Sequence, residues 1–252
     1  MGFFDLPAPL FAALDNLMGG LPAYPRLLIW AALTAVLSMA LYWLCSRQDE
    51  VAETKQRALD ARRSMASYQG TEFDELLPLA KESLVASGRH FGIVLWPALL
   101  SSLPALAIIV WVSNQYAFTL PQPGAYMHAH TEPDIPLADL SIVINQPELA
   151  FMVEYPDTGK SYDIVAANGE FLLTLPLSAP VPVVHKRQWW NWLIGNPNGY
   201  LPDENEIESI HFTLPAITYL RAGPGWVQGW EFSYFSLLII VSLAIKFAFR
   251  IH

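Results

Sequence analysis

The stretch FGIVLWPALLSSLPALAIIVWVSN, Phe91–Asn114, decides the fold of this 252-residue chain because it is long and apolar enough to cross a membrane. Its first 22 residues, Phe91–Val112, carry no charged side chain, and a helix of about 20 such residues spans a bilayer core. Two prolines and a Ser-Ser pair stand in the middle of the segment. A plain anchor would not need them, so this segment holds the main clue to function.

The prolines and the first of the two serines share one helix face. Pro97, Ser101 and Pro104 are spaced four and three residues apart, which is the spacing of neighbours on a helix. Each proline lacks an N–H, so Pro97 should free the carbonyl of Ile93 and Pro104 that of Leu100. A free carbonyl is costly in lipid. We therefore expect a kinked helix whose polar face turns away from lipid, with these carbonyls satisfied by the serine hydroxyls, a neighbouring helix or water.

Two further segments have the length and composition of membrane spans. Leu27–Cys45 contains 19 residues without a charge. Trp230–Phe249 is interrupted only by Glu231 at one end and Lys246 near the other, and both can reach the membrane interface. We predict three transmembrane helices, at 27–45, 91–112 and 230–249.

The overall composition fits such a protein. Hydrophobic residues make up 53% of the chain and charged residues 15%, whereas soluble domains are about 25% charged. The net charge of −9 argues against a nucleic-acid partner, since binding to phosphate needs an excess of Lys and Arg. The single cysteine, Cys45, excludes an intrachain disulfide.

Lys and Arg are concentrated in the segment between the first two spans. Residues 46–90 contain seven of them, whereas the much longer segment 113–229 contains four. Because cytoplasmic loops carry this excess, we expect 46–90 and the tail 250–252 to be cytoplasmic and 113–229 to lie outside. Residues 1–26 would also lie outside, as an amphipathic segment on the membrane surface or as disordered chain. The chain is thus expected to be a multi-pass protein of a cell membrane, with the bacterial inner membrane favoured.

The segment 46–90 is predicted to form a helical hairpin. It is rich in residues that favour helix, Gly70 breaks the first helix, and Gly88 is expected to end the second. One interpretation is a solvated connector between spans. The other is a surface that contacts clients or partners, for which the candidate residues are Arg57, Arg62 and Arg63.

The outside segment 113–229 is predicted to be an all-β, sandwich-like domain inserted between the second and third spans. A Pro-rich stretch, 117–135, is expected to lead into it in an extended conformation, and Asn168-Gly169 predicts a hairpin turn. The expected strand runs are 140–145, 148–155, 161–167, 170–177, 181–185, 207–215 and 216–220. The stretch QWWNWLIG, 188–195, predicts a short helix. It either packs into the core or docks on a membrane or partner through Trp189, Trp190 and Trp192.

Hydroxyl groups also recur on the other two spans. The first carries Thr34, Ser38 and Tyr42 at steps of four residues, and the third carries Ser242 and Lys246 one turn apart. Three helices with such faces can enclose a mildly polar groove, although ordinary helix packing also uses these residues. The predicted groove-lining residues are Thr34, Ser38, Tyr42, Pro97, Ser101, Ser102, Pro104, Ser242 and Lys246.

Catalytic and metal-binding signals are weak in this sequence. The chain has no nucleophile elbow, phosphate loop or zinc-ligand spacing, so neither an enzyme nor a cofactor is expected. His128 and His130 could hold a soft metal such as copper, with His185 or His211 as a third ligand. Solvated loop histidines are the alternative.

The order of the parts resembles the three-span core of the YidC/Oxa superfamily of membrane protein insertases, in the short archaeal and endoplasmic-reticulum layout. The resemblance lies in topology and composition, includes the stretch KQRALDARRSM, and covers roughly 26–116 and 226–252. It implies a groove that is open to cytosol and lipid and that eases the passage of a client's polar segment. It also places Thr34, Ser38, Ser101, Ser102 and Ser242 in that groove, with Arg57, Arg62 and Arg63 at its mouth.

Two other functions stay open. The chain could be an accessory or structural subunit of a larger membrane complex whose outside domain docks a partner. It could also be a periplasmic metal-handling protein. The proteins that co-purify with the chain and its metal content separate these alternatives from an insertase that acts on client membrane proteins.

Overall fold

The computed structural model describes residues 2–68, 70, 73–120, 126–132, 151–154, 162–165, 171–175, 179–204 and 207–251. The chain divides into two compact units. Unit 1 comprises Met1–Leu28 and Ala107–Tyr234, and unit 2 comprises Ile29–Leu106 and Phe235–His252. The divisions fall within long helices, so each of these helices contributes to both units.

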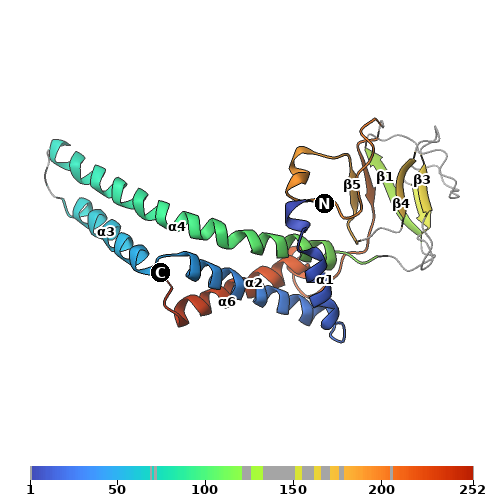
Figure 1. Ribbon diagram of the computed structural model, residues 1–252, viewed down its shortest axis with the longest axis horizontal. Coiled ribbons are helices and arrows are strands. Elements are labelled where there is room, and N and C mark those ends of the chain that lie inside the picture. The colour runs from blue at the N-terminus through green and yellow to red at the C-terminus, as the bar shows by residue number, and fades with distance from the viewer. Residues whose placement is uncertain are drawn as a thin grey trace. The chain divides into compact units, whose positions relative to one another are not determined.

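Three long apolar helices carry the predicted spans (Figure 1). They are α2 (Ala23–Cys45), α4 (Phe73–Tyr116) and α6 (Trp230–Ala248). Within the described residues, these three helices are long and apolar enough to cross a membrane. This agrees with the expectation of a membrane protein with several spans. Helix α2 begins four residues before the predicted span, at Ala23 rather than Leu27.

Helix α4 corrects one expectation. The predicted helix end at Gly88 is wrong, because α4 runs from Phe73 to Tyr116 over 44 residues and includes Pro78, Pro97 and Pro104. A single glycine costs only about 1 kcal/mol in a helix. The apolar run that follows Gly88 has no other way to satisfy its backbone in lipid than to remain helical, so the helix continues through it.

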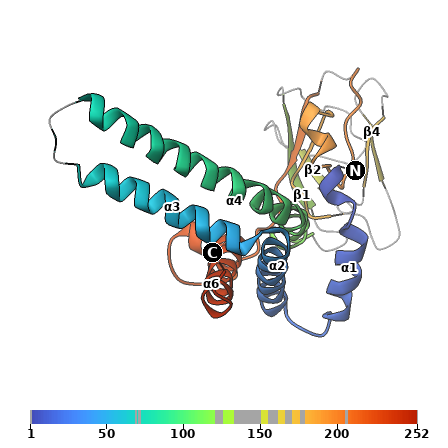
Figure 2. The ribbon, with the colours of Figure 1, turned by 60° about the vertical axis from the view of Figure 1, so that its left-hand side comes forward.

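The predicted helical hairpin is present in unit 2. Helix α3 (Gln48–Ala66) begins three residues after α2 ends and lies antiparallel beside the first part of α4 (Figure 2). Thr54 of α3 is buried, and its Oγ1 lies 3.1 Å from Nδ1 of His90 in α4. The buried face of α3 consists of Val51, Thr54, Ala58 and Ala61. This spacing of three, four and three residues, with small side chains, allows the two helices to approach closely.

Unit 1 contains a small antiparallel β structure, which confirms the coarse expectation for the region between spans two and three. One sheet has the strand order β2-β1-β6-β5. The hairpin of β3 (Tyr162–Val165) and β4 (Phe171–Leu175) is separate from it. The four strands of the sheet, all antiparallel, are β1 (Tyr126–Glu132), β2 (Phe151–Glu154), β5 (Val183–His185) and β6 (Ser209–Phe212).

Five of the expected strand runs contain strands β2 to β6, but two expectations differ from the structure. Residues 216–220 do not form a strand, since only an isolated bridge links Ala216 to Phe118. Strand β1 lies inside the stretch that was expected to be a merely extended entry, because its polar and small residues hide the β pattern. The run 140–145 and the Asn168-Gly169 turn lie outside the described residues.

Short helices complete unit 1. The N-terminal segment, which was expected to be amphipathic or disordered, forms η1 (Phe3–Asp5) and α1 (Ala8–Leu17). The QWWNWLIG stretch forms the 3₁₀ turn η2 (Trp189–Trp192), and α5 (Gly225–Gln228) precedes α6. The sheet side of the core includes Val184 and Ile210, both with no exposed surface.

Candidate functional site

The two serines of α4 are hydrogen-bonded within their own helix. Ser101 is buried, and its Oγ donates to the carbonyl of Ala98 at 3.0 Å. Ser102 is half-buried, and its Oγ donates to the carbonyl of Leu99 at 2.7 Å. These acceptors are not the carbonyls that the prolines should free. The hydroxyls therefore bond locally, as serines in helices commonly do, and the other two ways of satisfying the freed carbonyls stay open.

Of the hydroxyl-bearing residues Thr34, Ser38 and Tyr42 of α2, only Thr34 is fully buried. Thr34 has no exposed surface, and its Oγ1 donates to the carbonyl of Trp30 at 2.8 Å. Other predicted groove residues vary in burial: Pro97 is buried, Ser38, Tyr42, Pro104 and Ser242 are half-buried, and Lys246 is exposed. Burial of Thr34, Pro97 and Ser101 fits the expectation that these faces turn away from lipid, but it suits packing equally well.

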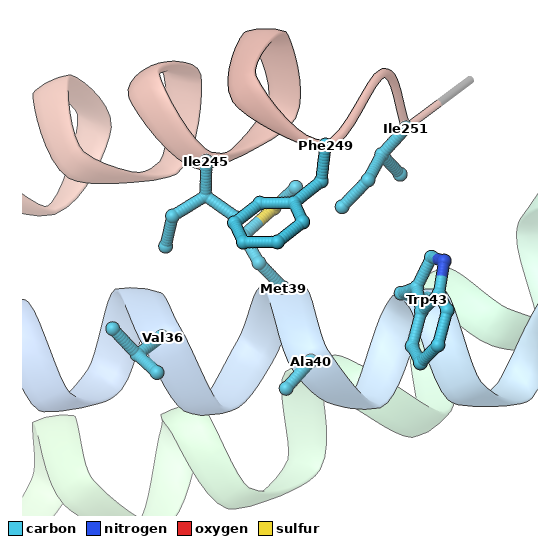
Figure 3. Close-up of a pocket in the computed structure, with 7 residues that line it drawn as sticks. All are labelled: Val36, Met39, Ala40, Trp43, Ile245, Phe249 and Ile251. Atoms are coloured by element: carbon cyan, nitrogen blue, oxygen red, sulfur yellow. The ribbon is translucent and has the colours of Figure 1, made fainter.

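A pocket of about 340 Å³ lies between α2 and α6 within unit 2 (Figure 3). Its lining is apolar throughout: Val36, Met39, Ala40, Trp43, Ile245, Phe249 and Ile251. None of the predicted groove residues belongs to this lining. The polar groove accordingly stays a prediction, while the pocket is a feature that sequence reasoning missed. Its signal was the spacing of Val36, Met39, Ala40 and Trp43 on one face of α2.

The arginines of the hairpin lie on the exposed side of α3. Arg57 pairs with Glu53 one turn earlier, and Arg63 lies 3.7 Å from Asp60. Arg62 is exposed and has no carboxylate within 4.0 Å among the described residues. Surface pairs of this kind contribute about 0.3–0.5 kcal/mol each, so a stronger acidic partner can displace them.

The tryptophans of η2 are exposed rather than packed into a core. Trp189 is 80% exposed and Trp192 is 60% exposed. Trp190 is also exposed, and its ring centroid lies 5.3 Å from that of His185. Of the two interpretations of this stretch, docking on a membrane or partner is therefore the one that these side chains can serve.

Hydrogen bonds hold η2 against the N-terminal turn η1. The N–H of Phe4 donates to the carbonyl of Leu193 at 2.9 Å. The carboxylate of Asp5 accepts from the N–H of Gly2 at 2.7 Å and from that of Gly195 at 2.8 Å. Exposed Phe3 and Leu6 therefore lie on a segment that is fixed to the exposed tryptophan turn.

A polar cluster in unit 1 was not anticipated from the sequence. Nη1 of Arg26 lies 2.6 Å from Oδ2 of Asp15, and the hydroxyl of Tyr116 donates to Oδ1 of the same carboxylate. Tyr219 donates its hydroxyl to the carbonyl of Tyr116 at 2.9 Å. Burial raises the pKa of Tyr219, Arg26 lowers it, and Glu231 raises it further. No sequence spacing links these residues, because 101 positions separate Asp15 from Tyr116.

The histidines give no metal centre in the described part of the chain. His130 stacks on His211 with ring centroids 4.9 Å apart, and Nε2 of His211 lies 3.0 Å from Oγ of Ser209. His185 contacts Trp190 and Tyr200 instead. Among the described residues, no three His, Cys, Asp or Glu side chains are placed to hold a metal ion. The side chain of His128 lies outside the described residues.

Comparisons with protein-family models, with curated proteins and with solved structures gave no match to this chain. The described residues offer a helical hairpin with exposed arginines that is joined to apolar helices, an apolar pocket and an exposed tryptophan turn.

Proposed function

We propose that this chain is a membrane protein insertase or assembly factor of the YidC/Oxa kind, and that its α3–α4 hairpin receives client proteins. The observation that carries the proposal is the direct junction of hairpin and spans. Helix α3 starts three residues after α2 ends, and α4 continues from the hairpin to Tyr116 as one helix. A segment bound on the hairpin is thereby held next to the ends of apolar helices.

Exposed arginines on α3, a helix with four basic and four acidic residues, support a role in capturing clients. Three guanidinium groups, those of Arg57, Arg62 and Arg63, project from its exposed side. Clustered cations attract acidic segments and raise the rate of encounter, and salt weakens this effect. The proposed orientation places them in the cytoplasm, where a newly made client emerges and where the positive-inside rule favours them.

The buried polar side chains of the spans supply the second half of the proposal. A polar client segment that crosses pure lipid meets a steep barrier. A face with Thr34, Pro97 and Ser101 can lower this barrier once a client separates the helices, because the hydroxyls then exchange their local bonds for bonds to the client. The apolar part of the client would leave sideways into lipid.

The β structure of unit 1 is proposed to form a sandwich-like domain on the outer side of a bacterial inner membrane. The N-terminus is proposed to lie on the same side. A cysteine introduced at exposed Asp203, in a Cys45→Ser background, tests this placement. It should react with a membrane-impermeant maleimide added to intact spheroplasts. Reaction only after the membrane is opened would reverse the proposed orientation.

The client role is tested by changing Arg57, Arg62 and Arg63 together to glutamine. The matched control changes three cations of unit 1, Lys186, Arg187 and Arg221, in the same way. A photoreactive residue at position 59 of α3 reports contact with a nascent client. We expect cross-links and client insertion to fall about tenfold with the hairpin variant and to stay unchanged with the control, since charge pairs of this type steer binding. Equal values for both variants would refute the client role of the hairpin.

A specific observation favours one second candidate, an accessory subunit that docks a partner outside the membrane. Trp189 and Trp192 are exposed on a turn that hydrogen bonds fix in place, and tryptophan is a frequent anchor of protein interfaces. Co-purification separates the two functions. Ribosomal or translocation components indicate an insertase, whereas one stoichiometric partner that is lost with Trp189→Ser/Trp192→Ser indicates an accessory subunit.

A further inference from the structure

The pocket is built from one face of α2, the end of α6 and the residues that follow α6 (Figure 3). Val36, Met39, Ala40 and Trp43 follow one another at steps of three, one and three residues on α2. Ile245 lies in the last turn of α6, and Phe249 is the first residue after that helix. The volume of about 340 Å³ is in the range of sites for small ligands, and a cavity with this lining offers water no hydrogen-bond partners.

The C-terminal turn closes one end of this pocket. After α6, Arg250 adopts a left-handed conformation with φ of 51°, and the N–H of Ile251 donates back to the carbonyl of Lys246 at 3.0 Å. This is the hydrogen bond of a helix-ending turn that usually has glycine at the left-handed position. The chain accepts the less favourable arginine there, and Ile251 lies against the pocket with only 6% exposure.

Cations are adjacent in sequence to the residues that line this end. Arg250 stands between Phe249 and Ile251, and Lys246 follows Ile245; both side chains are exposed. Arg47 lies four residues beyond Trp43 and is 86% exposed, with Glu50 at 3.4 Å as its neighbour. An apolar pocket whose lining residues are followed or flanked in sequence by exposed cations matches an amphiphile that has a hydrocarbon chain and a negatively charged head.

We propose that this pocket binds one acyl chain of an anionic phospholipid, whose phosphate lies against Arg250 and Lys246. The lining residues belong to helices with the length and composition of membrane spans, so hydrocarbon chains are the ligand at hand. Cationic side chains near a membrane surface favour anionic lipids. The proposal stands independently of the insertase function, because it requires only that α2 and α6 lie in a bilayer.

The test uses the full chain in nanodiscs that contain a phosphatidylglycerol with a photoreactive group in its acyl chain. Cross-linked peptides are mapped by mass spectrometry, and phosphatidylcholine with the same group serves for comparison. We expect cross-links in 36–43 and 245–251, with a preference for phosphatidylglycerol.

Two kinds of variant separate the pocket from its charges. Ala40→Phe fills the pocket, and Ala244→Phe adds the same side chain to an exposed alanine of α6 that does not line it. Arg250→Asn removes the charge but keeps a residue type that tolerates the left-handed turn, and Lys246→Gln removes the second cation. Ala40→Phe should lower cross-linking about tenfold, because the added ring occupies the space that the acyl chain needs and so weakens binding. The charge variants should each lower the preference for phosphatidylglycerol about fivefold and leave cross-linking to phosphatidylcholine intact.

The outcomes decide between occupants. Equal cross-linking of the Ala40→Phe and Ala244→Phe variants would mean that only the general lipid surround is labelled, and the site would be rejected. A co-purified polypeptide cross-linked in the pocket, in place of lipid, would reject it as well. If Ala40→Phe fails to fold, the Arg250→Asn variant still decides the question, because an unchanged lipid preference contradicts the role of the cationic end.

Discussion

Replacing Asp15 with asparagine should loosen the N-terminal helix α1 from the rest of unit 1. The carboxylate of Asp15 accepts hydrogen bonds from Arg26 at the start of α2 and from Tyr116 at the end of α4. The ring of Tyr116 also lies 5.9 Å from the guanidinium carbon of Arg26. Three segments that are distant in sequence are thus joined through one side chain.

The size of the effect follows from burial. The side chains of Arg26 and Asp15 are 25% and 15% exposed, so water screens the pair only in part. Removing one partner of a fully buried pair costs about 3–5 kcal/mol, and an exposed pair contributes about 0–1 kcal/mol. Asparagine retains one acceptor oxygen, so we expect a loss of about 2 kcal/mol. The Nε of Arg26 is already buried without a partner in the described part of the chain, which makes further loss costly.

Hydrogen exchange measured by mass spectrometry on the protein in nanodiscs is the suitable assay. If α1 opens locally, about 2 kcal/mol corresponds to about 30-fold faster exchange of its amides. The strands β5 and β6 serve as an internal reference. Tyr116→Phe tests the second hydrogen bond, and combining it with Asp15→Asn should give less than the sum of both effects, because the two changes remove one shared interaction.

Asp203→Asn is the matched control, since Asp203 is exposed and the same chemical change is made there. The reasoning is refuted if α1 exchanges equally fast in the Asp15→Asn and Asp203→Asn variants. It is also refuted if the effects of Asp15→Asn and Tyr116→Phe simply add.

Three further predictions concern other contacts. Gly2→Ala should release η1 from η2, because a Cβ there would lie 2.5 Å from the N of Gly195, whereas Gly20 has open space; limited proteolysis near residue 6 should accelerate for Gly2→Ala and not for Gly20→Ala. Thr54→Val removes the contact with His90 and should destabilise the hairpin by about 1 kcal/mol, seen as faster exchange in α3 than with the exposed Ser64→Ala. Burial raises the pKa of Tyr219 above its ordinary value of about 10. The stability that its neutral hydroxyl contributes is therefore complete below pH 10 and is lost as the pH rises beyond it. Melting temperatures should fall less steeply above pH 10 in Tyr219→Phe than in the wild type, and parallel curves would contradict this.

Hydropathy alone located the three membrane-type helices, although their lengths needed the structure. The span predicted at 91–112 is the second half of α4, whose first half belongs to the hairpin. The glycine at position 88 suggested a boundary because helix propensity is a local quantity. The structure keeps the helix intact because the segments on both sides of Gly88 are helical in their own right and the cost of one glycine is small.

The candidate sites divide in the same way. The positions of Arg57, Arg62 and Arg63 on an exposed helix face, and of the tryptophans in a short helical turn, follow from sequence patterns and agree with the structure. The bonding of Ser101 and Ser102 within their own helix does not follow from the pattern. A serine hydroxyl can bond to a carbonyl three residues earlier or to a carbonyl that a proline has freed, and the sequence does not distinguish the two. The pocket between α2 and α6 could not be predicted from the sequence either, because an apolar helix face has the same residue pattern whether it packs tightly or leaves a cavity.

What the sequence determined by itself is the presence of helices in the apolar segments and the small β region between the second and third of them. In lipid every backbone polar group must bond within its own segment, so composition and length are sufficient to specify a helix. The tertiary structure decided which residues meet: Asp15 with Arg26 and Tyr116, Asp5 with Gly195, and Ile251 with the face of α2. Such meetings depend on how whole helices and turns pack, and packing depends on the shape of every side chain at the contact rather than on any local pattern.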